Sequence, residues 1–286
     1  MQNVKNIFIH KIGGIVAYSE DNIIISAFLG LTAVATYGNY YYVFTAVSRL
    51  PAALYGSMRA GIGNRLNLAS REENFQLFLK IYRLVEIISL WCAAVMLAVF
   101  QPFIKLWVGN RPELARHFLT AALFVLFFHV QQSRQVVMIF KDAAGLWHKD
   151  RWKPLVSALI KLILNFLFVF RLPDNYKLDG FILASILAFL VIELPWESYA
   201  IFTILFNRRQ EKIYWRSQAR FAALALLFYP LTWTVAKAIT LDGFWGLVAK
   251  GAAAASFATV FLGVCFRQDF AQIWESCRAI LQKKKT

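Results

Sequence analysis

The stretch from Glu20 to Ser26, with the sequence EDNIIIS, sets two adjacent carboxylates inside an otherwise apolar run. A charged side chain at membrane depth costs about 2.5–3.5 kcal/mol on insertion scales, so it usually faces a protein-lined cavity rather than lipid. The stretch therefore predicts a membrane-spanning helix that turns its charged face to a wet interior. Charge in such an interior points to transport.

The composition of the whole chain agrees with a membrane location. Of its 286 residues, 59% are hydrophobic and the mean hydropathy is +0.53, whereas only 16% are charged. Soluble domains carry about 25% charged residues, so a soluble globular class is disfavoured. The net charge of +15 would suit nucleic acid, but the basic residues stand between apolar runs, where membrane topology places them.

The apolar runs predict an all-α, polytopic helical membrane protein with about eight transmembrane helices. A bilayer-crossing helix needs about 20 mostly apolar residues, whereas barrel strands alternate over about ten. The eight runs are 7–29, 35–59, 81–104, 114–140, 154–171, 179–205, 218–239 and 244–265, and we expect residues 1–286 to form a single bundle. An amphipathic helix near 70–83, capped by Ser70, is expected to lie on the membrane surface.

The basic residues are concentrated in alternate connections. They crowd 59–83, 141–153, 208–220 and the tail after 267. The positive-inside rule places those segments on the cytoplasmic side. We therefore expect a multi-pass protein of the cytoplasmic membrane with both termini in the cytoplasm, which an even number of spans requires.

The second run carries a charge at its middle. Arg49 stands just before Pro51, and a proline kinks a helix in the way that transporters use near binding sites. Arg49 either pairs with Glu20 or Asp21 or faces an anionic substrate. Arg59 extends the positive track toward the cytoplasm, although flanking by the positive-inside rule is its plainer interpretation.

The fourth run contains a polar cluster, Gln131, Gln132, Arg134 and Gln135. Four polar groups in five residues are hard to place against lipid, so this stretch is expected to line a cavity or a helix–helix contact. Arginine binds phosphate and carboxylate as a bidentate donor. Arg134, with Gln131 and Gln135 beside it, is therefore a candidate for binding a substrate anion, and hydrogen bonding between helices is the alternative.

Two carboxylates stand one helical turn apart in the sixth run, on either side of Pro195. Glu193 and Glu197 share a helix face and would bind a coupling cation or proton, or pair with Arg134. Lys161 in the fifth run is a further possible partner.

The connection after the fourth run holds further charges. Lys141-Asp142 and Asp150-Arg151 flank Gly145, and they form either intracellular salt bridges that lock one conformation or a solvated loop. Asp142 and Arg151 are thus candidate gating charges.

Nothing in the sequence predicts catalysis or a cofactor. The three cysteines lack metal-ligand spacing, and no nucleophile triad or phosphate-binding loop is evident. We expect no catalytic residues, no metal, no cofactor and no nucleic-acid partner.

Several separated motifs, in order, resemble bacterial polysaccharide flippases, the O-antigen and capsule repeat-unit translocases of the multidrug/oligosaccharidyl-lipid/polysaccharide exporter superfamily. They are 10–14 (HKIGG), 19–26 (SEDNIIIS), 37–41 (YGNYY), 102–109 (PFIKLWVG), 134–135 (RQ), 140–146 (FKDAAGL) and 150–154 (DRWKP). The match covers roughly residues 10–200, and the last two runs match in character only.

The resemblance implies a transporter of two helical bundles around a central cavity, of which this chain corresponds to the second. It implies alternating-access flipping of an undecaprenyl-pyrophosphate-linked oligosaccharide through a cationic lumen, where Arg49 and Arg134 would meet the pyrophosphate. The expected partners are the lipid-linked substrate, membrane lipids, and the missing amino-terminal bundle or a second copy. Two alternatives stay open: a multidrug exporter of the same superfamily, and a non-transporting half that needs a partner.

Overall fold

The computed structural model describes residues 20–269, which form helices and connecting turns without any strand. A helix over residues 20–29 comes first. The others are α2 (Leu31–Leu66), α3 (Arg71–Val108), α4 (Phe118–Ser133), α5 (Gln135–Ala143), α6 (Lys153–Arg171), α7 (Lys177–Ala188), α8 (Leu194–Ile204), α9 (Arg208–Lys237) and α10 (Gly243–Cys265). The expectation of an all-α protein is thus confirmed for the described residues.

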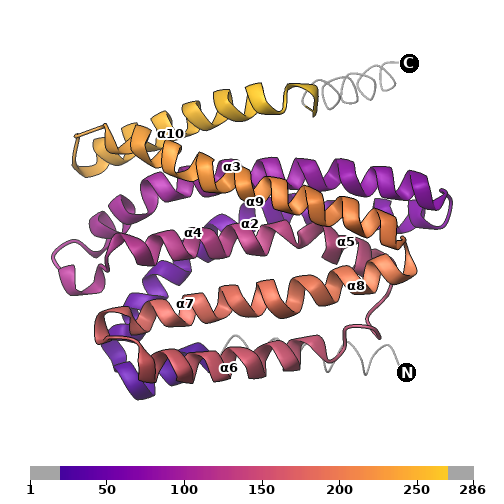
Figure 1. The fold of residues 1–286 in the computed structure, drawn as a ribbon. Helices are drawn as coiled ribbons and strands as arrows, with labels where there is room; N and C mark the ends of the chain where they lie inside the picture. Colours follow the sequence, from indigo (N-terminus) through magenta and orange to yellow (C-terminus); the bar gives the residue numbers. More distant parts are fainter. Residues whose placement is uncertain (1–19, 270–286) are drawn as a thin grey trace.

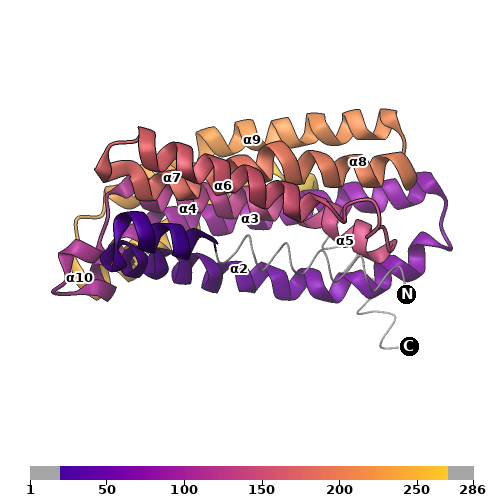
Figure 2. The same cartoon turned by 90° about the horizontal axis from the view of Figure 1, so that it is seen from below.

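The long helices run alongside one another, and their connections gather at the two ends of the molecule (Figure 1). Helix α3 is the central element, because it packs against α2, α4, α5, α9 and α10. Helices α2 and α9 lie on opposite faces of the bundle (Figure 2). A buried α3 explains why its apolar residues surround the helix rather than follow one stripe.

Within residues 20–269, six helical segments are long and apolar enough to cross a membrane, which indicates a helical membrane protein. They are Arg71–Val108, Pro112–Ala143, Lys153–Arg171, Asp174–Ile204, Arg208–Lys237 and Gly243–Cys265. Of the other two expected spans, 7–29 falls mostly outside the described residues. The run 35–59 lies in α2, which has 36 residues but is too polar to qualify.

The expected surface helix near 70–83 is wrong as a separate element. Its residues form the first turns of α3, which continues without a break to Val108. Ser70 does cap the helix, since its hydroxyl accepts the Glu73 N–H and the Glu73 carboxylate accepts the Ser70 N–H. The apolar side of 70–83 packs on protein, because Phe75 and Phe78 are buried against other helices.

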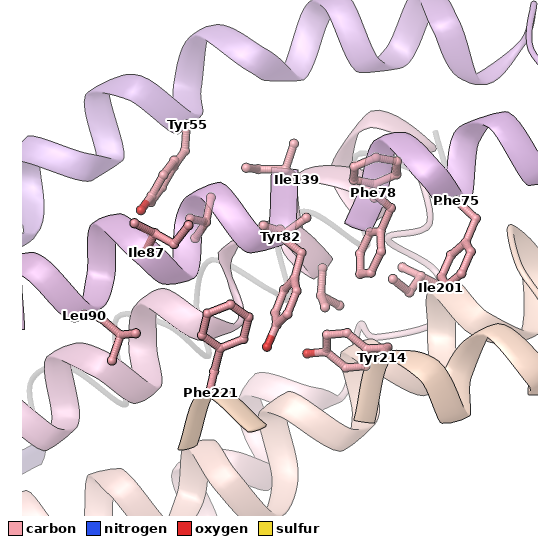
Figure 3. Close-up of a cluster of buried hydrophobic side chains, with 14 of the residues drawn as sticks. Tyr55, Phe75, Phe78, Tyr82, Ile87, Leu90, Ile139, Ile201, Tyr214 and Phe221 are labelled. Atoms are coloured by element: carbon pink, nitrogen blue, oxygen red, sulfur yellow. The ribbon is translucent and has the colours of Figure 1, made fainter. Parts of the chain in front are cut away.

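Aromatic side chains fasten this part of α3 to three other helices (Figure 3). The Phe78 ring centroid lies 5.2 Å from that of Phe140 in α5, 5.8 Å from Phe202 in α8 and 5.7 Å from Tyr214 in α9. Such pairs contribute about 0.5–1.5 kcal/mol each beyond the area they bury. The cluster therefore fixes α5 and α8, which carry Lys141, Asp142 and Glu197 of the charged site described below, against the core.

Two facing helices are irregular at the same level of the bundle. Arg134 interrupts the helix between α4 and α5. Between α7 and α8, residues Phe189–Glu193 form a π-helical turn, in which the Leu194 N–H reaches back five residues to the Phe189 carbonyl. Pro195 follows and has no N–H to donate to the Val191 carbonyl, which accounts for the altered pattern here. Irregular helix segments of this kind are frequent at functional sites.

Candidate functional site

A polar stripe on α6 organises the site. Lys153, Ser157, Lys161 and Asn165 recur every fourth residue, so they share one face of the helix, and all four are buried. On an otherwise apolar membrane-spanning helix, such a face must be covered by polar partners. Lys161 and Asn165 contact the helix at 20–29. Lys153 and Ser157 contact α8 and the π-helical turn before it.

The first partner group is centred on Asp21. The Lys161 ammonium lies 2.9 Å from Asp21 Oδ2 and 3.5 Å from Glu20 Oε1. The Tyr37 hydroxyl donates to Asp21 Oδ2 at 3.1 Å, and the Asn165 amide donates to Oδ1 at 3.0 Å. Asp21 is therefore a buried carboxylate with one cation and two hydrogen-bond donors around it.

A cavity of about 270 Å³ opens beside this group, and we call it the Asp21 cavity. Asp21 and Lys161 lie on its wall, together with Ser157 from α6 and Glu193 from the π-helical turn. The rest of the wall is mostly aromatic or amide: Asn22, Tyr37, Tyr41, Phe127, Gln131 and Phe189, with Gly38, Ser185 and Ala188. An apolar cavity with a few convergent polar groups is the usual form of a small-molecule site.

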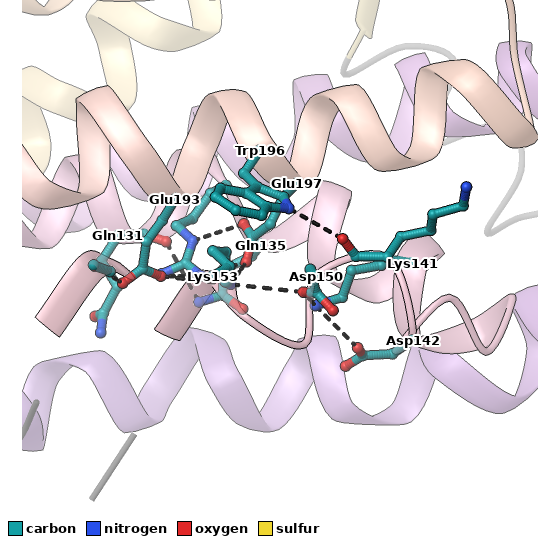
Figure 4. Close-up of polar contacts among 12 residues, drawn as sticks. Gln131, Gln135, Lys141, Asp142, Asp150, Lys153, Glu193, Trp196 and Glu197 are labelled. Carbon is teal, nitrogen blue, oxygen red and sulfur yellow. Dashed lines mark hydrogen bonds and ion pairs between the residues drawn. The ribbon is translucent and has the colours of Figure 1, made fainter. Parts of the chain in front are cut away.

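The second partner group is centred on Glu197, which is completely buried (Figure 4). Arg134 holds it through two hydrogen bonds, from Nε at 3.0 Å and from Nη2 at 2.6 Å. The same Nη2 lies 2.7 Å from Glu193, and the Lys153 ammonium donates to Glu197 as well. Ser157 completes the group by donating to Glu193 at 2.8 Å.

The charges continue as a chain toward the basic connections. Lys153 lies 3.8 Å from Asp150, which is ion-paired with Lys141, and Lys141 lies 3.8 Å from Asp142. Asp142 in turn lies 3.6 Å from Arg59 on α2. We call the eight side chains the Glu197 network: Arg59, Arg134, Lys141, Lys153, Asp142, Asp150, Glu193 and Glu197. Its cations and carboxylates are equal in number, which satisfies the rule that buried charges must be paired.

The two irregular helix segments build the contact between network and cavity. The Arg134 guanidinium lies at the α4–α5 break and 4.6 Å from the centroid of the Phe189 ring, at the start of the π turn. Glu193, at the end of that turn, contacts Arg134 and also lines the cavity. A change in the cavity wall can therefore reach the network through Glu193 and through Phe189.

The structure gives partners to the charged residues for which the sequence left alternatives open. Glu20 and Asp21 are paired with Lys161 and not with Arg49, which is exposed on α2 and does not line the Asp21 cavity. Arg134 is buried and its guanidinium is engaged by Glu193 and Glu197, so in this conformation it is not open to an external anion. The pairing follows from desolvation, because an unpaired guanidinium at that depth would be very costly.

The other predicted residues are divided between cavity, network and surface. Gln131 lies on the cavity wall, and Gln135 donates to its carbonyl at 3.4 Å. Arg59 and Asp142 belong to the network. Arg151 is exposed, and its guanidinium carbon lies 5.6 Å from the centroid of the Trp152 ring. Within residues 20–269, no ion pair joins Arg151 to an acid.

Sequence reasoning missed the α6 stripe as a unit. Lys153 was counted with a basic connection, and Ser157 and Asn165 were not considered. The signal was present, since polar residues at four-residue spacing in an apolar run mark one buried face. A further buried pair, Glu86 and His129 with 4.0 Å between Oε2 and Nε2, lies in the helix core and apart from this stripe.

Comparisons with known proteins supply no relative. A scan against family models finds no match, and neither a curated protein nor a solved structure matches the chain. Within residues 20–269, no group of three or more His, Cys, Asp or Glu side chains is gathered as a metal site.

Proposed function

We propose that this chain is a helical bundle of a transporter that flips undecaprenyl-pyrophosphate-linked oligosaccharide across the cytoplasmic membrane by alternating access. The observation that carries the proposal is the Asp21 cavity, a polar and aromatic-walled space between membrane-spanning helices. The resemblance of the sequence motifs to polysaccharide flippases supplies the substrate class. The chain would act as a transporter rather than an enzyme.

The chemistry of the cavity suits a sugar. Sugar hydroxyls need both donors and acceptors, and Asp21, Ser157 and Gln131 provide them at separate points of the wall. The apolar faces of sugar rings pack on aromatic side chains, which Tyr37 and Phe189 offer. At about 270 Å³ the cavity lies just below the usual range for ligand sites, so it would hold one part of an oligosaccharide.

The lipid pyrophosphate would bind along α2. This helix is long enough to cross a membrane, but it exposes Arg49 and carries Arg59 and Arg65, so it is better suited to a wet interface than to lipid. A second bundle, either another chain or a second copy, would complete a path against it. Arg49 and Arg59 would then offer cations to the pyrophosphate while the sugar occupies the Asp21 cavity.

The Glu197 network would act as the gate on the cytoplasmic side. It joins α2, α5, α6 and α8 by ion pairs near the connections that are rich in Lys and Arg. Opening that side would require these pairs to exchange partners or to admit water, and substrate contact with Glu193 would favour the exchange. Glu20 and Asp21 would shift with Lys161 in the same movement.

The test is a flipping assay with the full chain and its membrane partners in proteoliposomes. A fluorescent lipid-linked oligosaccharide in the inner leaflet becomes accessible to an added quencher only after flipping. Asp21→Asn and Gln131→Ala should each lower the rate at least about tenfold, the equivalent of 1.4 kcal/mol. Gln76→Ala, at an exposed position, is the matched control.

Two results would contradict the proposal. Normal flipping by Asp21→Asn would remove the cavity from the mechanism, and no flipping by the unmodified protein with its partners would remove the function. Arg49→Ala tests the pyrophosphate path separately, because it should slow flipping of the lipid-linked sugar while it leaves the fold unchanged.

A small-molecule exporter of the same superfamily is the second candidate. Asp21 and Glu193 lie on the cavity wall, and carboxylates there would favour a cationic compound once their partners move away. The same proteoliposomes loaded with a cationic dye distinguish the two, because only the exporter would release dye.

A further inference from the structure

A second cavity, which shares no lining residue with the Asp21 cavity, lies at the end of the bundle where α3 and α9 finish and α10 begins (Figure 1, left). It has a volume of about 310 Å³. Its wall is apolar for the most part, with Leu97, Ala98, Pro102, Leu106, Phe118, Trp233, Ala236, Leu241 and Leu247. We call it the lysine cavity, after the charges described next.

Three lysines from three different helices converge on this cavity. They are Lys105 near the end of α3, Lys237 at the end of α9 and Lys250 within α10. Lys237 lies 4.9 Å from the centroid of the Trp233 ring. Asp242 is the one carboxylate on the wall, and no ion pair joins any of the three lysines to an acid within residues 20–269.

Lys250 is a charged residue inside a membrane-spanning helix, where an ammonium group without a counter-charge is energetically unfavourable. It stands seven residues into α10, which at 1.5 Å per residue is about 10 Å from the start of a membrane-spanning helix. It is half-buried, and a lysine at such depth either extends its ammonium to the interface or meets an anion. Lys250 lines the same cavity as Lys105 and Lys237, so three cationic side chains border one space.

The location also runs against the distribution of charge in the chain. The connections richest in Lys and Arg, at 59–83, 141–153 and 208–220, gather at the opposite end of the bundle (Figure 1). Topology alone therefore gives no reason for a cluster of three cations here. A ligand of opposite charge does.

We propose that the lysine cavity binds the phosphate headgroup of an anionic bilayer lipid. The three ammonium groups would hold the phosphate, and the leucine-rich wall would carry the first part of the acyl chains. The lipid would also fill the gap between α3, α9 and α10. This inference needs only that the chain lies in a membrane, so it is independent of the proposed transport.

The first experiment measures lipid retention by the full chain. The protein is purified into nanodiscs that contain equal amounts of phosphatidylglycerol and phosphatidylcholine, and native mass spectrometry identifies the lipid that remains bound after release. The unmodified protein should retain phosphatidylglycerol in preference. The triple variant Lys105→Gln/Lys237→Gln/Lys250→Gln should lose that preference by about a hundredfold, as three lysine–lipid contacts predict.

The matched control neutralises three exposed lysines at the opposite end, in the variant Lys80→Gln/Lys149→Gln/Lys212→Gln. It removes the same net charge and should keep the preference. Retention of phosphatidylglycerol by the Lys105 triple variant, or no preference in the unmodified protein, would overturn the proposal. A folding check by size-exclusion chromatography ensures that loss of lipid is not loss of structure.

Two further arms identify the source of the phosphate and its place. Inorganic phosphate or glycerol phosphate that displaces the lipid at millimolar concentration would show a site for a soluble anion and overturn the lipid assignment. A photoreactive phosphatidylglycerol should crosslink to peptides that contain Trp233 or Leu247. Crosslinks confined to α2 would place the anionic lipid elsewhere and count against this cavity.

Discussion

The two ends of the bundle use lysine in opposite ways. In the Glu197 network, Lys141 and Lys153 are almost completely buried, and each is paired with a carboxylate of the chain itself. In the lysine cavity, Lys105 and Lys237 are exposed and have no such partner among the described residues. The difference shows that a cation enclosed by helices needs a carboxylate of the same chain as its partner. A cation at the membrane border can instead pair with an anion from the lipid.

The largest expected effect comes from removing the central acid of the network. Glu197→Gln leaves Arg134 and Lys153 buried without full compensation, which should lower the free energy of unfolding by about 3–5 kcal/mol. Unfolding in mixed detergent micelles, followed by tryptophan fluorescence, measures the change. Glu113→Gln, at an exposed position, is the control. A loss below about 1 kcal/mol would mean that the network does not hold the bundle together.

A smaller loss is expected at the Asp21 cavity. Lys161→Met removes the cation beside Asp21, but that carboxylate keeps its hydrogen bonds from Tyr37 and Asn165. We therefore expect a loss of about 1–3 kcal/mol in the same unfolding experiment. An equal loss of unfolding free energy in Lys161→Met and Glu197→Gln would contradict this, because it would mean that the hydrogen bonds from Tyr37 and Asn165 do not compensate for the lost cation.

Removing a buried pair together should cost less than removing one member. The double variant Lys141→Met/Asp150→Leu takes out both charges at once and should change the free energy of unfolding by about 1 kcal/mol or less, in either direction. The single variants should each cost more, so a double-mutant cycle isolates the coupling. Additive single effects would show that the pair acts through other partners, of which Lys153, 3.8 Å from Asp150, is one.

The smallest effect is expected at the lysine cavity. Lys237→Gln removes an exposed cation that has no ion-pair partner within residues 20–269, so the free energy of unfolding should change by no more than about 0.5 kcal/mol in detergent without anionic lipid. Added phosphatidylglycerol should stabilise the unmodified protein more than the variant, because a ligand of the folded state adds to stability. A large loss of unfolding free energy in detergent alone would contradict the difference drawn between the lysine cavity and the Glu197 network.

The sequence predicted the apolar helices well and failed where polar and apolar signals compete. Six expected spans correspond to helices that qualify as membrane-crossing, because long apolar runs have few other stable forms. The run 35–59 contains five Tyr and one Phe, and to count tyrosine as apolar overstates the hydropathy of α2, which also carries Arg49 and Arg59. The amphipathic pattern at 70–83 looked like a membrane-surface helix because a protein core and a lipid surface require the same stripe.

For the site, the sequence named charges but not their partners. Glu193 and Glu197 stood one turn apart around Pro195, and pairing with Arg134 was one of the open alternatives; the structure has that pair. The sequence could not predict the partners of Lys153 and Asp150, because their contacts depend on how the turn before α6 packs against α8. The alternative that paired Arg49 with Glu20 or Asp21 was wrong, because a charge in the middle of a run does not reveal which face of the helix lies inside. Contact of Arg49 with a substrate anion stays a prediction.

The π turn at Phe189–Glu193 has a consequence for how this chain tolerates length changes. A π turn accommodates one residue more than the α-helical turn it replaces. Deleting a single residue at most positions of a helix rotates everything after it by about 100°. A deletion within 189–193 would instead convert the π turn to an ordinary α-helical turn, so Glu197 would still face Lys153 while the Glu193 position changed. A one-residue deletion here would therefore alter the cavity wall without disturbing the helices on either side.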